Sequence, residues 1–113
     1  MPLTKIYANL SCSDLADSAA WFGKIFARSP DARPMAGLAE WHHESSSGFQ
    51  LYQEPDKAGK GTLTLIVDDL VVEIARLGEK GVVAGKIEEA DYTSIVRLND
   101  PDGNLVVLAQ PKG

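Results

Sequence analysis

The second half of this chain repeats the organisation of the first half. The residues Ser13 to Leu15 follow an apolar strand and open a helix, and Asp68 to Leu70 do the same in the second half. Asp14 and Asp69 are 55 residues apart, and Gly23 and Gly78 are separated by the same interval. Each half reads as a strand, a helix and three short strands. A repeat of this length exceeds a solenoid unit and predicts two related modules that pair, with a cleft between them.

The chain length limits how these modules can be organised. The 113 residues suit one compact domain with one core, or two half-domains that share it. Residues 54–61 are polar, contain a proline and two glycines, and form the best internal boundary. We therefore expect a single domain over 1–113, with an N-terminal module at 1–56 and a C-terminal module at 57–113.

Composition excludes several classes of function. The hydrophobic content of 44% and charged content of 24% are ordinary for a soluble globular protein. The net charge of −5 disfavours nucleic acids and anionic membranes as partners, because both select a basic face. Acidity is compatible with a cationic ligand or with solubility alone. The sequence has no run of about 18 apolar residues and no leader pattern, so we expect a cytoplasmic protein.

Cys12 is the single cysteine, which makes an intrachain disulfide impossible. It closes an apolar strand and is expected to be a small packed side chain. A nucleophilic role would need a base as partner, and none is close in sequence.

Periodicity and turn residues predict the elements of each half. A helix is expected after Ser13 or Asp14 and before Ser29-Pro30, and a second helix after Asp68 or Asp69 that ends near Gly81. Strands are expected at residues 4–11, 33–36, 38–44 and 49–54 of the first half, and at 62–67, 82–88, 93–98 and 105–109 of the second.

The sequence Asp-Pro-Asp-Gly-Asn at 100–104 stands directly before the final apolar strand. Together with the two matched modules, it resembles the vicinal oxygen chelate superfamily, which includes glyoxalases, extradiol dioxygenases and bleomycin-resistance proteins. The resemblance covers nearly the whole chain. It implies an α+β fold, in which two βαβββ modules form curved mixed sheets around a U-shaped cleft with the helices outside. It also implies a homodimer, because members often pair.

Enzymes of this superfamily hold a divalent metal ion with His and Glu side chains from four strands. The resemblance carries those four positions onto Tyr7, Gln50, Thr62 and Val107. None of these side chains is a good ligand, because valine cannot coordinate and the two hydroxyls stay protonated at neutral pH. The only histidines, His42 and His43, are neighbours on a strand and so point to opposite faces. We therefore predict no bound metal and no cofactor.

Strand alternation indicates which side chains share the cleft face with these positions. Trp41 and His43 share one face of their strand and are expected to add an aromatic wall, with Arg97 across from them. The expected ligand-binding residues are Tyr7, Asn9, Trp41, His43, Gln50, Tyr52, Thr62, Thr64, Arg97 and Val107. Such a surface suits a small, partly aromatic ligand held by stacking and a few hydrogen bonds. Alternatively, Trp41 and Tyr52 fill the core or a dimer interface.

The leading hypothesis for function is a metal-independent small-molecule-binding protein of the glyoxalase/bleomycin-resistance type, acting by sequestration. The alternative is a glyoxalase-like lyase, isomerase or dioxygenase with non-standard catalytic residues or metal ligands. Its acid–base candidates are His43 with Tyr7 or Glu54. A third hypothesis is a structural or regulatory dimer with no small ligand. The sequence assigns no catalytic residue and does not name the ligand.

Overall fold

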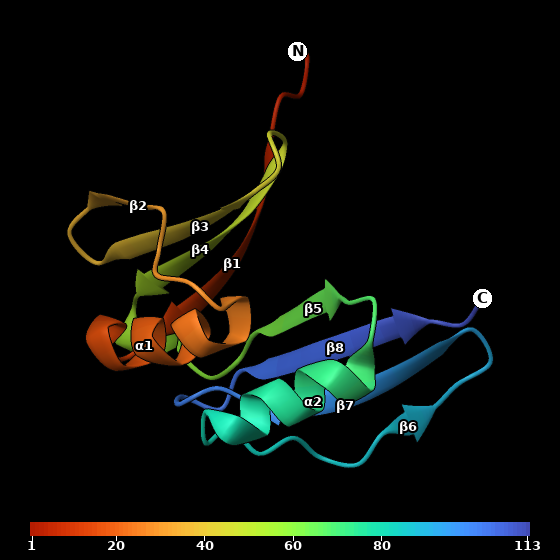
Figure 1. The fold of residues 1–113 in the computed structure, drawn as a ribbon. Helices are drawn as coiled ribbons and strands as arrows, with labels where there is room; N and C mark the ends of the chain where they lie inside the picture. Colours follow the sequence, from red (N-terminus) through yellow and green to blue (C-terminus); the bar gives the residue numbers. More distant parts are fainter.

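The chain folds into two four-stranded sheets, each with one helix (Figure 1). The computed structural model describes all residues, 1–113. The first half contains β1 (Ile6–Cys12), α1 (Leu15–Phe26), β2 (Ala32–Met35), β3 (Leu38–His43) and β4 (Ser47–Gln53), followed by a 3₁₀ turn at Pro55–Lys57. The second half contains β5 (Thr62–Ile66), α2 (Leu70–Glu79), β6 (Glu88–Glu89), β7 (Thr93–Asn99) and β8 (Leu105–Pro111).

The two sheets have the same topology. Their strand orders are β1-β4-β3-β2 and β5-β8-β7-β6. The pairs β1–β4 and β5–β8 are parallel, and all other neighbouring strands are antiparallel. The predicted α+β fold of two βαβββ units with mixed sheets is confirmed. The edge strands β1 and β5 lie beside one another. Each sheet packs one face against its own helix, since α1 contacts β3 and β4 and α2 contacts β7 and β8, and no helix covers the other face.

Both helices begin with the same pair of caps. Asp14 and Asp69 each accept a hydrogen bond at 3.1 Å from the backbone N–H three residues later, so the second of each pair of candidate caps is the one used. Gln53 and Gln110, at the ends of β4 and β8, accept the first N–H of α1 and α2 at 2.9 and 2.7 Å. The repeat therefore extends to the capping chemistry. Neither helix is long and apolar enough to cross a membrane.

One segment differs from the sequence-based expectation. The strand predicted at 82–88 is reduced to the two residues of β6, because only these pair with β7, and Val83 is 89% exposed. The helix α1 ends at Phe26, before the Ser-Pro pair, where Ala27 takes a left-handed φ of 60°. The end of α2 is as expected, since Gly81 has a φ of 81°.

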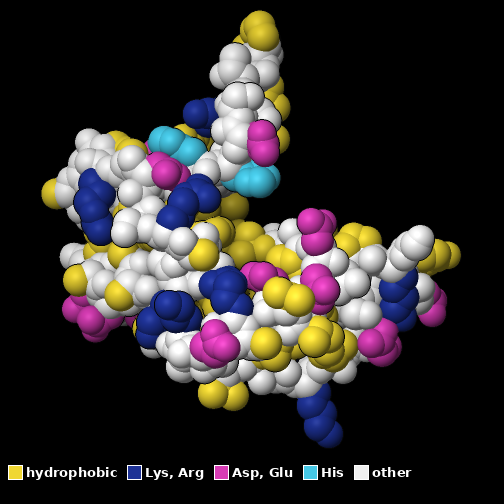
Figure 2. Space-filling model, in the orientation of Figure 1, with side chains coloured by type: hydrophobic (Ala, Val, Ile, Leu, Met, Phe, Trp, Pro, Cys, Tyr) yellow, Lys and Arg dark blue, Asp and Glu magenta, His cyan; other side chains and the backbone are white.

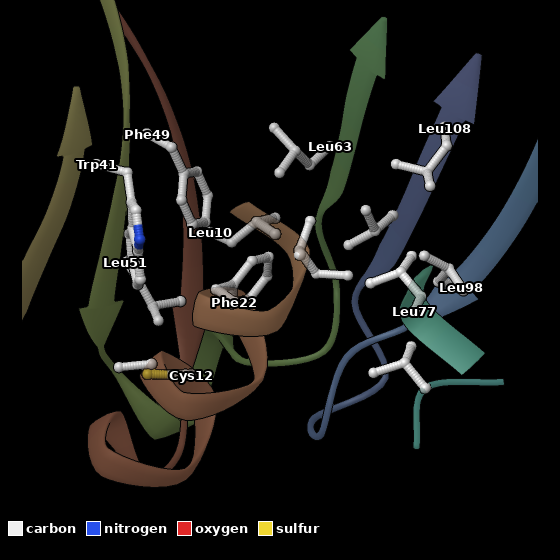
Figure 3. Packing of buried hydrophobic residues seen from close by; sticks show 14 of the residues in the cluster. Leu10, Cys12, Phe22, Trp41, Phe49, Leu51, Leu63, Leu77, Leu98 and Leu108 are labelled. Atoms are coloured by element: carbon white, nitrogen blue, oxygen red, sulfur yellow. The ribbon is translucent and has the colours of Figure 1, made fainter. Parts of the chain in front are cut away.

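A single apolar core joins the two halves. Seventeen buried residues form one cluster, and Figure 3 shows Leu10, Phe22 and Leu63 directed toward one another between the two sheets. Phe22 also packs among the rings of Phe26, Trp41 and Phe49 under the first sheet. Burial of this apolar area is the main stabilising contribution to the arrangement.

Cys12 belongs to the same core and is fully buried. Burial raises the pKa of its thiol to about 11, so the thiol stays protonated at neutral pH. This agrees with the expected packing role, because an unreactive thiol in an apolar cluster behaves as a small hydrophobic side chain.

The turn between β7 and β8 connects the second half to the first through Asn104, which is completely buried. Its side-chain amide donates to the Ser11 carbonyl at 2.9 Å and to Asp100 at 2.8 Å, and its oxygen accepts the Gly61 N–H at 2.9 Å. A Cβ at Gly61 would overlap the side chain of Leu10, so a larger residue there would displace Leu10 within the core. One amide thus satisfies backbone groups of β1 and of the segment that enters β5.

Two further side chains cross between the halves. Asp102, in the same turn, accepts hydrogen bonds from the Ser13 N–H at 3.1 Å and from the Ser18 hydroxyl at 3.3 Å, at the start of α1. Arg76 of α2 donates to the carbonyls of Lys24 and Ile25 at 2.7 and 2.8 Å, in the last turn of α1. Both ends of α1 are therefore held by the second half.

We predict that Asn104→Ala lowers the free energy of unfolding by roughly 3 kcal/mol, because it removes a buried amide and leaves the half-buried Gly61 N–H and Ser11 C=O without its hydrogen bonds. Equilibrium denaturation with urea measures this change. Asn99→Ala is the matched control, since Asn99 is exposed and its side chain makes no hydrogen bond, and it should cost less than about 0.5 kcal/mol. Equal losses in the two variants would contradict the role given to Asn104.

Candidate functional site: a polar face on the first sheet

A buried carboxylate lies at the centre of the open face of the first sheet. Glu40 is 8% exposed, and three side chains converge on it. The amide of Gln50 donates to Oε2 at 2.8 Å, Nε2 of His42 lies 3.1 Å from Oε1, and the Tyr7 hydroxyl lies 3.5 Å from the same oxygen. We call Tyr7, Glu40, His42 and Gln50 the polar cluster.

Strand register brings the polar cluster together. Glu40 stands directly opposite Gln50 in the antiparallel β3–β4 pair, and Gln50 stands opposite Asn9 in the parallel β1–β4 pair. Gly48 is the cross-strand neighbour of Tyr7, and a Cβ at Gly48 would lie only 2.7 Å from the Tyr7 ring. The ring of Tyr7 therefore packs on the backbone of Gly48, which has no side chain to block it. In this position the ring places its hydroxyl beside Glu40.

The environment of Glu40 favours its ionised form. The hydrogen bond from Gln50 lowers the pKa of this carboxyl, burial pushes the pKa upward, and the contact with His42 lowers it again. The net direction is downward from the ordinary value of 4.5. The face thus carries a recessed negative charge at neutral pH.

The remaining predicted residues of the first sheet lie on this same face. Asn9 is exposed and Tyr52 is half-buried, and the register places both beside the polar cluster. On the second sheet, Thr64 and Arg97 each stand opposite Val107 on neighbouring strands, and Thr62 shares their face. That face is more apolar, and its one cation, Arg97, forms an ion pair with Glu88 at 2.8 Å.

The expectation that Trp41 and His43 form an aromatic wall with these residues is wrong as to their position. Trp41 pairs with Phe49 across the hairpin, is 1% exposed, and donates its indole N–H to the Arg28 carbonyl on the helix side of the sheet. His43 shares that side by strand alternation, and Figure 2 shows the two histidines on opposite sides of the projecting sheet. Arg97 consequently does not face them from the open side.

Trp41 and His43 instead border a groove of about 510 Å³ between the two halves. The groove is also lined by Phe26 at the end of α1 and by Thr64 and Leu65 of β5. It is mostly apolar, and Figure 2 shows hydrophobic side chains in the hollow below the projecting sheet. Ten expected binding residues are therefore divided between the open faces and this groove.

Glu40 and His42 were absent from the set expected from sequence. The signal that identifies them is the register of the β3–β4 hairpin, where Trp41 pairs with Phe49 and Glu40 with Gln50. Phe49 belongs to the apolar side of its strand and so faces the helix. Its cross-strand partner Trp41 must face the same side, which leaves Glu40 and His42 on the open face.

The divalent metal that the resemblance implies does not fit this donor set. The positions implied by the resemblance hold a phenol, a neutral amide, a hydroxyl and an isopropyl group, from Tyr7, Gln50, Thr62 and Val107. Glu40 and His42 add one carboxylate and one imidazole, but no three His, Cys, Asp or Glu side chains come together in this structure. We therefore derive no step through a metal ion.

The pKa of Glu40 predicts a specific acid response. A lowered pKa stabilises the fold above the ordinary carboxyl value, and that stabilisation is lost as the pH falls below about 4.5 and through the pKa of the folded protein. Glu40→Gln should reduce the difference in unfolding free energy between pH 7 and acid, measured by urea denaturation. Glu79→Gln, an exposed and unpaired control, should not change it. An identical pH profile for Glu40→Gln and the parent protein would contradict the assignment.

Comparison with known proteins supports the fold from outside the chain. No protein-family model and no curated protein matches the sequence. A glyoxalase/bleomycin resistance protein from Catenulispora acidiphila shares 28% identity over 94% of this chain and 96% of its own, with a TM-score of 0.85. TnmS3, an antibiotic-binding protein from Streptomyces sp. CB03234, shares 22% identity over 96% and 95%, with a TM-score of 0.82. A bleomycin-binding protein complexed with bleomycin shares 20% identity over 96% and 98%, with a TM-score of 0.78. The chain has the fold of the glyoxalase/bleomycin-resistance proteins, consistent with the vicinal oxygen chelate superfamily.

Proposed function

We propose that this protein is a cytoplasmic homodimer that binds a small organic molecule, without a metal ion, on the open face of its first sheet. The observation that carries the proposal is the carboxylate of Glu40, buried to 8% exposure and surrounded by hydrogen-bonding side chains on a face that no helix covers. A recessed, satisfied charge on an open sheet face is a feature that packing alone does not require.

The polar cluster indicates what kind of ligand fits. A carboxylate has about four lone-pair sites, and the three side chains around Glu40 use three of them. The remaining site accepts a hydrogen bond from an amine, amidine or similar donor, and a cationic donor gains most from the charge. The rings of Tyr7 and Tyr52 on the same face supply surface for a planar group. The favoured ligand is therefore a partly aromatic molecule that carries a hydrogen-bond donor or positive charge.

The structural neighbours support binding as the activity. One of them is complexed with bleomycin, and another is an antibiotic-binding protein. Both share the whole fold with this chain over more than nine-tenths of its length. Binding of an organic molecule requires only the cleft, and it remains available to a chain whose metal positions hold non-ligand side chains.

The proposed homodimer is supported by the sheet faces and apolar side chains that a single chain leaves uncovered. We take residues 1–56 and 57–113 as the two modules of one domain, each with an uncovered sheet face. Of the polar cluster, only His42 lines the groove between the halves, and no member lines the groove along α1, so neither groove encloses the cluster. Large apolar side chains such as Ile66, 67% exposed, remain bare on the second sheet. A second copy would cover these side chains and close the cleft.

A second candidate function is a metal-independent lyase or isomerase. The observation that favours it is the contact at 3.1 Å between Glu40 and His42, with the Tyr7 hydroxyl alongside. A carboxylate that orients an imidazole is a common acid–base arrangement. His42 therefore replaces His43 as the candidate acid–base histidine. Turnover of a bound ligand that His42→Gln abolishes, with affinity kept, would favour this candidate over sequestration.

We predict that a thermal-shift screen of small aromatic amines and guanidines, with bleomycin included, will find compounds that raise the Tm. Glu40→Gln should weaken the affinity of such a compound about tenfold, because it removes the charge but keeps the shape. Treatment with EDTA should leave the affinity unchanged. The thermal-shift screen measures the change in Tm, and isothermal titration measures the affinities of the variant and of the EDTA-treated protein.

Glu79→Gln is again the control, since it removes one negative charge far from the cleft face. Two results count against the proposal. The first is that no compound in the screen shifts the Tm, and the second is that binding depends equally on Glu79 and Glu40. Loss of binding with EDTA would point instead to a metal site.

We predict that the protein sediments as a dimer at micromolar concentrations. Ile66→Glu should shift it toward the monomer, because it places a charge on an apolar surface that the second copy covers. Val83→Glu is the matched control, because Val83 is also exposed but lies in the segment before β6. A monomeric parent protein in analytical ultracentrifugation would overturn the dimer.

A further inference from the structure

A second groove, of about 760 Å³, runs along the outer side of α1. Its floor consists of small residues of the helix, among them Ala16, Ala20 and Gly23, so nothing bulky stands between solvent and the helix backbone. The segment after α1 and Arg33 of β2 form one wall, and Arg76 of α2 and Lys80, directly after α2, form the other. This groove is separate from the polar cluster and from the groove between the halves, with which it shares only Arg28.

The groove is strongly basic in an acidic protein. Five cationic side chains line it, and no Asp or Glu does: Lys24, Arg28, Arg33, Arg76 and Lys80. The whole chain has 11 Lys and Arg residues against 16 Asp and Glu, so almost half of its positive charge gathers at one place. Figure 2 shows this concentration of Lys and Arg side chains over the helices.

Three of the five cations have no partner. Arg28 pairs with Asp31 at 3.0 Å, and Arg76 pairs with Glu73 at 2.9 Å, while Lys24, Arg33 and Lys80 form no ion pair. Like charges that converge without counter-ions repel one another, so their proximity has a cost unless an anion joins them. Helix-dipole stabilisation accounts for Lys24 and Lys80 near the ends of α1 and α2, but not for Arg33 on a strand.

The negative end of α1 is neutralised within the protein. Arg76 donates to the carbonyls of Lys24 and Ile25 in the last helical turn. An incoming anion therefore meets guanidinium and ammonium groups, with the nearest carbonyl oxygens already bonded. The volume lies within the range of about 300–1,000 Å³ that is usual for small-molecule sites.

We propose that this groove binds a small polyanion of the phosphate-ester class, held by the three unpaired cations Lys24, Arg33 and Lys80 over the small-residue floor of α1. Arginine binds phosphate oxygens in a forked, bidentate manner, and lysines supply point charges, which together suit a phosphate or pyrophosphate group. The net charge of −5 disfavours nucleic acid as the source of that phosphate. The site is independent of the binding function proposed for the first sheet.

The test is a titration of the full chain with inorganic tripolyphosphate at constant ionic strength, followed by two-dimensional amide NMR. Saturable shifts are expected at α1, at the segment after it and at the end of α2. The double variant Arg33→Gln/Lys80→Gln should weaken binding at least about tenfold, because two charge-assisted contacts are lost. Glu40→Gln should bind tripolyphosphate as the parent protein does.

The matched control is Lys60→Gln/Lys86→Gln, which removes the same total charge outside the groove. Equal weakening by the two double variants would reduce the effect to general electrostatics and overturn the site. Shifts centred elsewhere, or no saturation, would do the same. A parallel arm uses vesicles of phosphatidylcholine with phosphatidylinositol phosphate. Binding to these vesicles without binding to tripolyphosphate would overturn the soluble ligand in favour of a lipid surface.

Discussion

The buried side chain of Asn104 is the interaction on which the arrangement of the two halves depends. It lies at 0% exposure and satisfies a carbonyl of β1 and an N–H of the segment entering β5 at the same time. An amide is needed because it both donates and accepts, whereas an aspartate at this position could not donate to the Ser11 carbonyl. Asp100 accepts from the Asn104 backbone and side chain and so holds the amide in place. Two edge strands can therefore lie together without forming a ladder between them.

This connection has consequences for the open face of the first sheet. Because β1 is held at Ser11, its register against β4 decides where Tyr7 and Asn9 stand relative to Gln50. The hairpin of β3 and β4 then brings Glu40 beside Gln50 and His42 beside Gly48. The polar cluster is thus a product of strand register in three neighbouring strands, and each of its hydrogen bonds joins residues that lie near or across from one another in the sheet.

Sequence reasoning was accurate where the information is local or repeated. The aspartate caps follow from a short pattern that recurs in both halves, and the positive φ of Gly81 follows from a local signal after α2. The prediction for Trp41 and His43 failed because strand alternation shows that they share a face but not which face it is. The pairing of Trp41 with Phe49 places that face on the helix side. The prediction at 82–88 failed because a β-branched run forms a strand only where a neighbour supplies hydrogen bonds. The contacts of Arg76 with the end of α1 join distant segments and leave no local signal.

The positions at which the resemblance implies metal ligands hold side chains that pack or hydrogen-bond in other ways. The ring of Tyr7 occupies the space that Gly48 leaves open, and its hydroxyl is directed at Glu40, so this position now serves the carboxylate. Replacing Tyr7 by histidine would supply one imidazole but would also remove the ring from the Gly48 surface. Thr62 and Val107 on the second sheet would still contribute no ligand. Because the four positions implied by the resemblance belong to two sheets, no single substitution would assemble a metal site there. The proposed binding function, which uses the carboxylate of Glu40, needs no such site.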